Sequence, residues 1–297
     1  MEQDIKTIRE EQPLMVTIWC ITYNHEPYIR QCLKGFIMQE TNFRFEAIVH
    51  DDASTDGTAA IIREYAKKYP NIIKPILETE NQYSKHDGTI RRMLNKHTHG
   101  KYVAMCEGDD YWTDPLKLQK QVDFLESHPD YSMCYSDIIC YNQKQNKFHD
   151  WTLSKSDIIT TEDLIRYNRV HTLTTLIRNS LLIEYSRFAN RLPPFPLGDY
   201  PMWLWMSLKN PIYHFKEKTG VYRVLEKSAS HLDNPLKQFR FRLAGYDIRL
   251  IFIREFNLKH KDYYLHRLKF IVTECLKNRW YKELFLNIFK PRYRLFK

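Results

Sequence analysis

The stretch Lys101-Tyr-Val-Ala-Met-Cys-Glu-Gly-Asp-Asp110 indicates the fold class of this chain most directly. An apolar run typical of a buried strand stops at Gly108 and at two adjacent carboxylates, Asp109 and Asp110. Hard divalent cations such as Mg²⁺ and Mn²⁺ take oxygen ligands of this kind. The pattern predicts a metal site at the tip of a strand, and its alternative is a polar turn that caps the following helix.

An earlier stretch repeats this pattern. The apolar run Phe45-Glu-Ala-Ile-Val-His50 ends in Asp51 and Asp52. Taken alone, these two residues would form a turn with an Asx hydrogen bond. Because ligands bind at the carboxyl ends of strands in open α/β sheets, two acid-ended strands predict one shared pocket at that edge.

Apolar periodicity predicts alternating strands and helices over the first half of the chain, and this alternation is typical of a mainly parallel sheet. Beyond 150 the alternation weakens, with possible strands at 172–177 and 212–221 and a buried helix at 200–208. The predicted strands of the first half span 14–22, 45–50, 72–77, 101–106 and 131–135, and the helices span 29–39, 59–69, 89–97 and 115–127.

Length and charge suggest one large α/β domain, at 1–235, followed by a basic helical extension, at 236–297. The chain has 297 residues and a net charge of +9, and residues 255–297 alone hold eleven Lys/Arg against four Asp/Glu. The rest is near neutral, which argues against nucleic acid as a partner. Six cysteines without a Cys-x-x-Cys pair favour buried thiols in a reducing compartment.

The N-terminus shows no secretory signal, and no apolar run reaches the roughly 20 residues that span a bilayer. We therefore expect a cytoplasmic protein. The extension carries an apolar stripe among basic residues, and two interpretations stay open. It packs on the catalytic domain or on a second subunit in a homodimer, or residues 255–297 lie on anionic lipid at the inner face of the cell membrane. The predicted stripe comprises Leu265, Leu268, Val272, Leu276, Trp280, Leu284 and Ile288.

Four further polar residues are candidates for a site. Asp199 precedes an apolar helix, so it is either a helix N-cap or a general base. Arg91 and Arg92 are either solvated helix residues or ligands of a diphosphate, whose oxygens a guanidinium binds in bidentate fashion. His231 alone would be a surface loop histidine.

Three ordered motifs resemble those of the inverting family-2 nucleotide-sugar glycosyltransferases of GT-A fold. They are Thr22-Tyr23-Asn24, the segment 49–58 and the segment 100–110, which ends in Glu-Gly-Asp-Asp. The resemblance covers 14–140 well and extends more weakly to 233. It implies a Rossmann-like, mainly parallel sheet flanked by helices.

The resemblance also implies roles for the candidate residues. Thr22, Tyr23 and Asp52 would hold the base and ribose of the nucleotide, and Asp109 would contact ribose or metal. Asp110 would coordinate Mn²⁺ or Mg²⁺ on the diphosphate. The remaining matches are Asp199 as catalytic base, His231 near the diphosphate and metal, and Arg91 and Arg92 near the donor.

Two departures from the family pattern refine this expectation. The usual Asp-x-Asp reads Gly108-Asp109-Asp110 here, without its first acid, and the Gln-x-x-Arg-Trp of processive synthases is absent. The resemblance then implies metal-dependent, inverting transfer of one sugar per encounter. The donor would be a UDP- or GDP-sugar, and the acceptor a glycan or lipid-linked hydroxyl in bacterial surface polysaccharide or lipopolysaccharide assembly.

Two other functions stay as alternatives. Paired acids and a metal also suit a nucleotidyltransferase, although its Gly/Lys-rich phosphate loop is not visible in the sequence. A carbohydrate- or partner-binding module with a decayed site has no reason to keep Asp52, Asp110 and Asp199.

Overall fold

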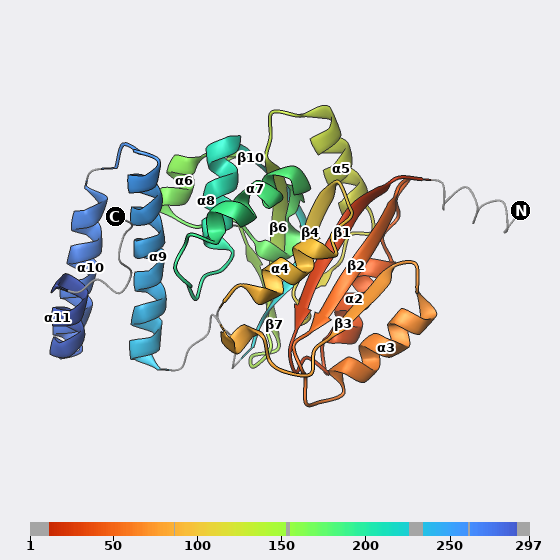
Figure 1. The fold of residues 1–297 in the computed structure, drawn as a ribbon, viewed down its shortest axis with the longest axis horizontal. Coiled ribbons are helices and arrows are strands. Elements are labelled where there is room, and N and C mark those ends of the chain that lie inside the picture. The colour runs from red at the N-terminus through yellow and green to blue at the C-terminus, as the bar shows by residue number, and fades with distance from the viewer. Residues whose placement is uncertain (1–11, 86, 153–154, 226–233, 261, 290–297) are drawn as a thin grey trace, which may run out of the picture.

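The structure, a computed structural model, describes residues 12–85, 87–152, 155–225, 234–260 and 262–289. Within these residues the chain forms one ten-stranded sheet with helices on both faces (Figure 1). The strands are β1 (Leu14–Thr22), β2 (Arg44–Asp51), β3 (Ile73–Leu77), β4 (Tyr102–Met105), β5 (Tyr111–Trp112), β6 (Met133–Asn142), β7 (Lys147–Trp151), β8 (Ile158–Ile159), β9 (Leu176–Arg178) and β10 (Ile212–Val224).

The sheet has the order β3-β2-β1-β4-β9-β6-β10-β5, and β7 and β8 pair with β6 and β10. The strands β1 to β4 are parallel to one another, as the alternating sequence pattern predicts. The pair β6 and β10 is also parallel, and the short strand β9 lies antiparallel between β4 and β6. The sheet is therefore mainly parallel, with antiparallel insertions in its second half.

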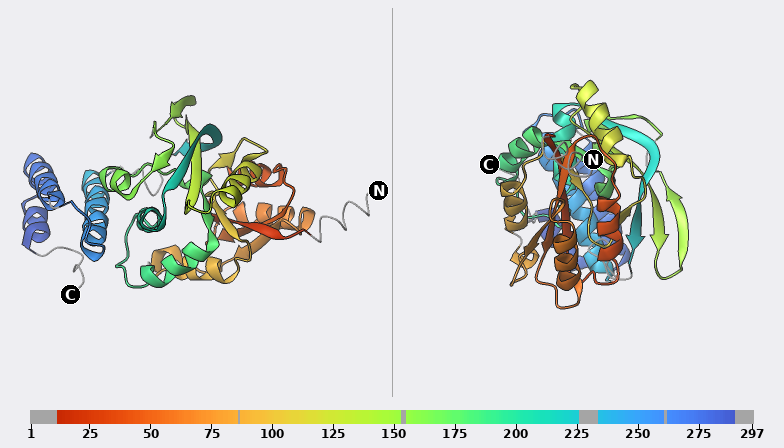
Figure 2. Two further views of the ribbon diagram at one scale, coloured as in Figure 1. Left: turned by 90° about the horizontal axis from the view of Figure 1, so that it is seen from above. Right: turned by 90° about the vertical axis from the view of Figure 1, so that its right-hand side faces the viewer.

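The helices divide between two faces of the sheet, seen edge-on in Figure 2. Successive side chains of a strand point to opposite faces. Accordingly Trp19 belongs to the apolar core that contains residues of α4, α7, α8 and α9, whereas Ile18 and Cys20 belong to the core that contains residues of α2, α3 and α5. The helices are α2 (Ile29–Ile37), α3 (Thr58–Lys68), α4 (Thr89–Lys96), α5 (Lys117–Ser127), α6 (Thr161–Arg166), α7 (Asn179–Ala189), α8 (Tyr200–Lys209), α9 (Pro235–Glu255), α10 (Tyr263–Lys277) and α11 (Tyr281–Phe289), with 3₁₀ turns η1 (Tyr83–Lys85) and η2 (Thr172–Thr174).

The predicted strand at 172–177 divides into the turn η2 and the strand β9. In η2 the amide of Thr174 donates to the carbonyl of His171 at 3.1 Å, so the backbone closes a turn here instead of pairing with a neighbouring strand. The strands β5, β7 and β8 and the helices α6 and α7 are elements that the sequence pattern does not predict. All six cysteines are buried and free, in agreement with the expected thiols.

The C-terminal helices form a layer at one end of the molecule (Figures 1 and 2). The predicted single apolar stripe is wrong, because α10 ends at Lys277 and Arg279 has a positive φ of 59°. After this turn Trp280, Leu284 and Ile288 pack against a small core formed by α9 and α10, whereas Leu265 and Leu276 are exposed. The predicted boundary at 235/236 coincides with the start of α9, although α9 shares its apolar core with α8.

Candidate active site

The candidate site lies at the carboxyl ends of β1, β2 and β4. Thr22 is paired with Asp51 across β1 and β2, and the amide of Asp52 donates to the carbonyl of Thr22 at 3.0 Å. The amide of Gly108 donates to the carbonyl of Ile21, also at 3.0 Å. The two acid-ended strands therefore meet at one edge, on either side of β1.

Gly108 allows the acidic turn to contact the end of β1 closely. A Cβ at this position would lie 2.6 Å from both Cβ and Oγ1 of Thr22 and 3.0 Å from Nδ1 of His25. Thr22 Oγ1 and His25 Nδ1 are themselves buried, without a hydrogen-bond partner among the described residues. Two unpaired polar atoms thus face the backbone of the acidic turn.

Asp52 holds the loop that follows β3. Its Oδ1 accepts from the amide of Gln82 at 2.7 Å, and its Oδ2 accepts from the amide of Tyr83 at 3.0 Å. The ring of Tyr83 is exposed, as is that of Tyr23 after β1. Asp52 therefore binds the backbone of Tyr83 through its carboxylate. Through its own amide it binds the end of β1, which directly precedes Tyr23.

The acidic turn holds three carboxylates in different surroundings. Asp110 is almost fully buried, and its Oδ1 accepts from the amide of Arg223 at 2.8 Å. Burial, together with the charges of Asp109 and Glu107, raises the pKa of Asp110 well above its usual value. Asp109 is partly exposed, with its Oδ2 4.0 Å from Nε2 of His25. Asp109 is thus the more accessible of the two predicted acids.

Glu107 is absent from the predicted site residues, although Glu107-Gly108-Asp109 is itself an acid–x–acid triplet. Burial raises the pKa of Glu107, and the neighbouring charges of Asp109 and then Asp199 act in the same direction, so that its pKa is about 7. This electrostatic link places Asp199 near the acidic turn. The signal that could have revealed Glu107 is the spacing of acids in the sequence, with Glu accepted in place of Asp.

Arg223 is a second residue that the sequence pattern does not reveal. Its guanidinium lies over the rings of Tyr28, Tyr111 and Tyr141 at 5.2, 4.9 and 5.8 Å, and it also donates to Gln31. These contacts hold Arg223 at the end of β10, where its backbone amide donates to Asp110. The contact joins residues 113 positions apart in sequence, so no local pattern predicts it.

Asp199 occupies the N-cap position of α8, but its side chain does not cap that helix. Instead its Oδ2 accepts from the hydroxyl of Thr172 at 2.7 Å. This geometry disfavours the simple N-cap interpretation. The carboxylate is held from the neighbouring turn η2, and no hydrogen bond to its Oδ1 is found among the described residues.

The two arginines of α4 differ. Arg91 Nη2 donates to Oδ1 of Asn190 at 2.9 Å, and its guanidinium lies 5.8 Å from the ring of Tyr185. Burial raises the pKa of Tyr185. The charge of Arg91 lowers this pKa and the charge of Asp199 raises it, so Tyr185, Arg91 and Asp199 are neighbours. Arg92 binds the start of its own helix, through Asp87 and Thr89. Arg91 therefore lies toward the site.

His231 lies outside the described residues. Within the described residues, no group of three or more His, Cys, Asp or Glu side chains is arranged to hold a metal. The donor set at the acidic turn nevertheless fits a hard cation, because three mutually repelling carboxylates gather within four positions. Mg²⁺ typically takes only one or two carboxylates and completes its shell with water and substrate phosphates.

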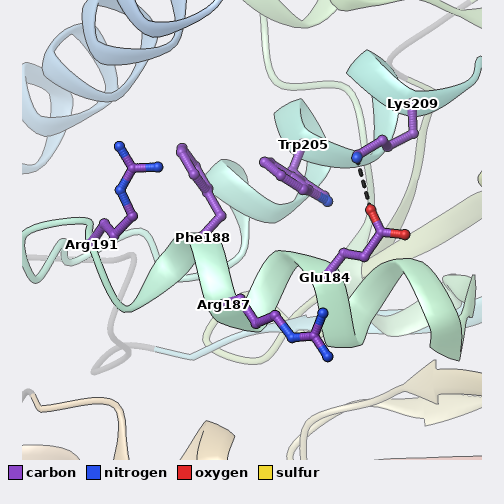
Figure 3. A pocket seen from close by; sticks show the side chains of 6 residues that line it. All are labelled: Glu184, Arg187, Phe188, Arg191, Trp205 and Lys209. Atoms are coloured by element: carbon purple, nitrogen blue, oxygen red, sulfur yellow. Dashed lines mark hydrogen bonds and ion pairs between the residues drawn. The ribbon is translucent and has the colours of Figure 1, made fainter.

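A surface pocket of about 350 Å³ lies elsewhere, between α7 and α8 (Figure 3). Lys209 Nζ binds Oε2 of Glu184 there at 2.8 Å. None of the predicted site residues lines this pocket, which Glu184, Arg187, Phe188, Arg191, Trp205 and Lys209 surround.

Two solved structures share this fold. One is TarS 1–349 of S. aureus in complex with UDP-GlcNAc, with a TM-score of 0.61 and 17% identity over 87% of this chain and 81% of that one. The other is the mannosyltransferase PcManGT of Pyrobaculum calidifontis in complex with GDP-Man and Mn²⁺, with a TM-score of 0.56 and 15% identity over 98% and 87% of the two chains.

Sequence relatives agree with this likeness. An uncharacterized protein of Mycobacterium tuberculosis is 40% identical over 164 residues, 55% of this chain and 46% of that protein. The chain thus spans about half the length of this relative. The dTDP-rhamnosyl transferase RfbG of Shigella flexneri is 26% identical over 70% of this chain and 72% of its own.

Among the described residues, no helix combines the length and apolar composition needed to cross a bilayer. The model of the glycosyl transferase family 2 matches residues 17–185, more than half of the chain. With the sheet order, the acid-ended strands and the structural likeness, this match means that the chain belongs to glycosyl transferase family 2 and has the GT-A fold.

Proposed function

We propose that this chain transfers a single sugar from a UDP- or GDP-sugar to a hydroxyl acceptor, with inversion and with the help of Mn²⁺ or Mg²⁺. The observation that carries the proposal is the convergence at one sheet edge of the acidic turn, the Thr22–Asp52 strand ends and Asp199. A nucleotide, a cation and an acceptor hydroxyl are the three groups that such a transfer must bring together.

The nucleotide would lie over the ends of β1 and β2. Exposed rings at Tyr23 and Tyr83 offer stacking surfaces for a base, and Asp52 stands between their two loops. Each Asp52 oxygen accepts one backbone hydrogen bond, and a carboxylate oxygen has a further lone pair for a base N–H. Thr22 lies beside these groups, with its unpaired Oγ1 available to a polar ligand.

The diphosphate would lie between the acidic turn and α4. Asp109 and Asp110 are the proposed metal ligands, Glu107 adds negative charge behind them, and His231 is the proposed further ligand. A divalent cation held by these residues would supply positive charge against the charge of the leaving diphosphate. Arg91 is the better placed of the two arginines to bind phosphate oxygens, and Arg92 supports the start of α4.

Asp199 is the proposed general base. The hydroxyl of Thr172 donates to Oδ2 and so fixes the carboxylate, which leaves Oδ1 to take the proton of the acceptor hydroxyl. The deprotonated oxygen then attacks the anomeric carbon on the face opposite the diphosphate. The C–O bond to the diphosphate breaks as the new glycosidic bond forms, and one displacement inverts the configuration.

The acceptor would be a glycan or a lipid-linked sugar, in the assembly of a bacterial surface polysaccharide or lipopolysaccharide at the inner face of the membrane. The similar proteins are named for or bound to UDP-, GDP- and dTDP-linked sugars, so family membership alone does not select the base.

A screen of nucleotide sugars tests the proposal. Purified chain would be incubated with each UDP- and GDP-sugar, with and without Mn²⁺, and nucleotide diphosphate release would be measured. We expect metal-dependent release from one donor class and none from the Asp199→Asn chain. Equal release of nucleotide diphosphate with Mn²⁺ and after removal of metal by a chelator would contradict the proposed cofactor.

A further inference from the structure

The layer formed by α9, α10 and α11 distributes its charges unevenly. The carboxylates of α10 and α11 bind arginines of α9: Glu274 lies 3.8 Å from Arg242, and Glu283 forms an ion pair with Arg240. In the opposite sense, Asp247 of α9 binds Arg267 of α10 at 2.6 Å. Glu274 and Glu283 are therefore paired with arginines inside the layer.

The side of α10 that points away from α9 is apolar and basic. Leu265, Lys269, Val272 and Leu276 follow one another at spacings of four, three and four residues, so they share one face of the helix. Leu265 is 60% exposed and Leu276 is 53% exposed. The opposite face, with Phe270, Ile271 and Cys275, is buried against α9. Tyr281, at the start of α11, is 63% exposed.

Four cations of this layer are exposed. Lys269 shares the face of α10 that carries Leu265 and Leu276, Lys277 ends α10, Arg279 lies in the following turn and Lys282 lies on α11. No ion pair involves these four cations within the described part of the chain, and Asp262, at the N-cap of α10, is an exposed acid near Leu265. We give the name outer surface to Leu265, Leu276, Tyr281 and the four cations. This set combines exposed apolar side chains with an excess of positive charge.

We propose that this outer surface docks on a membrane rich in anionic lipid. Apolar side chains would enter the interface between headgroups and acyl chains, and the lysines and arginine would bind lipid phosphates. A second copy of the chain fits less well, because a twofold contact would bring the same unpaired cations together. The docking itself does not depend on the proposed sugar transfer.

The layer connects this surface to the candidate active site. Arg249 of α9 donates through Nε to the hydroxyl of Tyr200 at 2.5 Å, and Tyr200 directly follows Asp199. Tyr200 in turn donates to the carbonyl of Leu164 at 2.6 Å. Docking would therefore hold the proposed base at a fixed position above the bilayer, where a lipid-linked acceptor is presented.

Vesicle co-sedimentation of the full chain tests the proposal without any sugar donor. Vesicles of phosphatidylcholine with and without phosphatidylglycerol would be compared at low and high ionic strength. We expect binding only with phosphatidylglycerol, weakened by salt. The double variant Lys277→Glu, Lys282→Glu should lose at least roughly tenfold in the binding constant, because each cation near an anionic surface contributes. The matched control is Lys34→Glu, Lys67→Glu, which changes the same charge on exposed residues of α2 and α3.

The variant Leu265→Ser, Leu276→Ser tests the apolar part of the surface, and its binding should be weaker than that of the wild type at both low and high ionic strength. Thermal unfolding by circular dichroism would check that every variant is folded. Equal binding by wild type and both double variants would overturn the proposal. So would a stable dimer, seen by light scattering, that the same variants dissociate. Donor hydrolysis measured on the same samples separates a failed docking surface from a failed glycosyltransferase.

Discussion

The hydroxyl of Thr172 donates a 2.7 Å hydrogen bond to Oδ2 of Asp199, at the start of α8. Thr172 belongs to η2, the turn between α6 and β9, so the carboxylate is oriented from outside its own helix. Fixing a base in this way removes rotamer freedom before the acceptor arrives.

This contact makes Thr172 a positioning residue with a graded effect. Asp199→Asn should lower kcat by roughly 10²–10⁴-fold, the usual contribution of a general base. Thr172→Val should lower kcat by roughly tenfold, and Thr172→Ser should restore it, because a hydrogen bond to a carboxylate is among the stronger ones. Steady-state kinetics would measure this order. Wild-type turnover in Thr172→Val would show that Asp199 needs no such support.

A methyl group at Gly108 should separate the acidic turn from β1. Gly108→Ala would place a Cβ 2.6 Å from Thr22, and we expect about 1–3 kcal/mol of destabilisation and loss of nucleotide binding. Gly245→Ala is the matched control, because its nearest neighbour is the flexible end of Arg249 at 3.6 Å. Inside α9 it should instead gain about 0.5–1 kcal/mol. Urea unfolding and nucleotide titration would compare the two variants, and similar effects would contradict the proposed contact.

Metal-dependent nucleotide binding should depend on Asp109. Asp109→Asn keeps the size of the side chain but removes the charge, so binding of UDP or GDP with Mn²⁺ should weaken by at least roughly 10- to 100-fold, the loss that even indirect changes around metal sites cause. Calorimetry with and without Mn²⁺ would measure it, with the exposed Asp130→Asn as control. If Mn²⁺ strengthens nucleotide binding equally in all three chains, Asp109 is not a ligand.

Lys117 should make stability depend on pH. It is fully buried beneath Trp112, 4.1 Å from the ring, and burial lowers its pKa to about 7. Its folded pKa is below its unfolded value of 10.5, so between these values the unfolded chain binds a proton that the folded chain does not. The free energy of unfolding should therefore rise as the pH increases from 7 toward 10.

The variant Lys117→Met isolates this titration. It loses the hydrogen bond to Gln121, which shifts its stability at every pH, but the slope between pH 7 and 9 should flatten. Urea unfolding across this range measures the slope. An identical slope in both chains would show that Lys117 is protonated in the folded state.

The sequence predicts the first half of the fold well, because strands β1 to β4 are apolar runs bounded by polar turns. The strand 14–22 agrees with β1 at both ends, and the helices between strands differ only at their termini. The predicted carboxyl edge also holds Thr22, Asp52 and the acidic turn together, since parallel strands align those ends.

The second half is less predictable for physical reasons. The strands β5 and β8 have two residues each and pair with the distant strand β10, so no local periodicity marks them. The strand β7 forms a hairpin with β6, but its residues are mostly exposed and show no alternation of apolar and polar side chains. Arg223 contributes to the site through its backbone and a set of tyrosines, which no spacing reveals. The stripe predicted across 265–288 assumes one continuous helix, and the turn at Arg279 breaks it. His231 lies outside the described residues, so its role stays a prediction.

A crystal structure with UDP or GDP and Mn²⁺ tests the central claim most directly, because Mn²⁺ can be located by its anomalous scattering. The account predicts one Mn²⁺ between the diphosphate and the Asp109–Asp110 turn, with the base over the loops of Tyr23 and Tyr83. A nucleotide bound in the pocket between α7 and α8, or a Mn²⁺ that contacts neither acid, would contradict it.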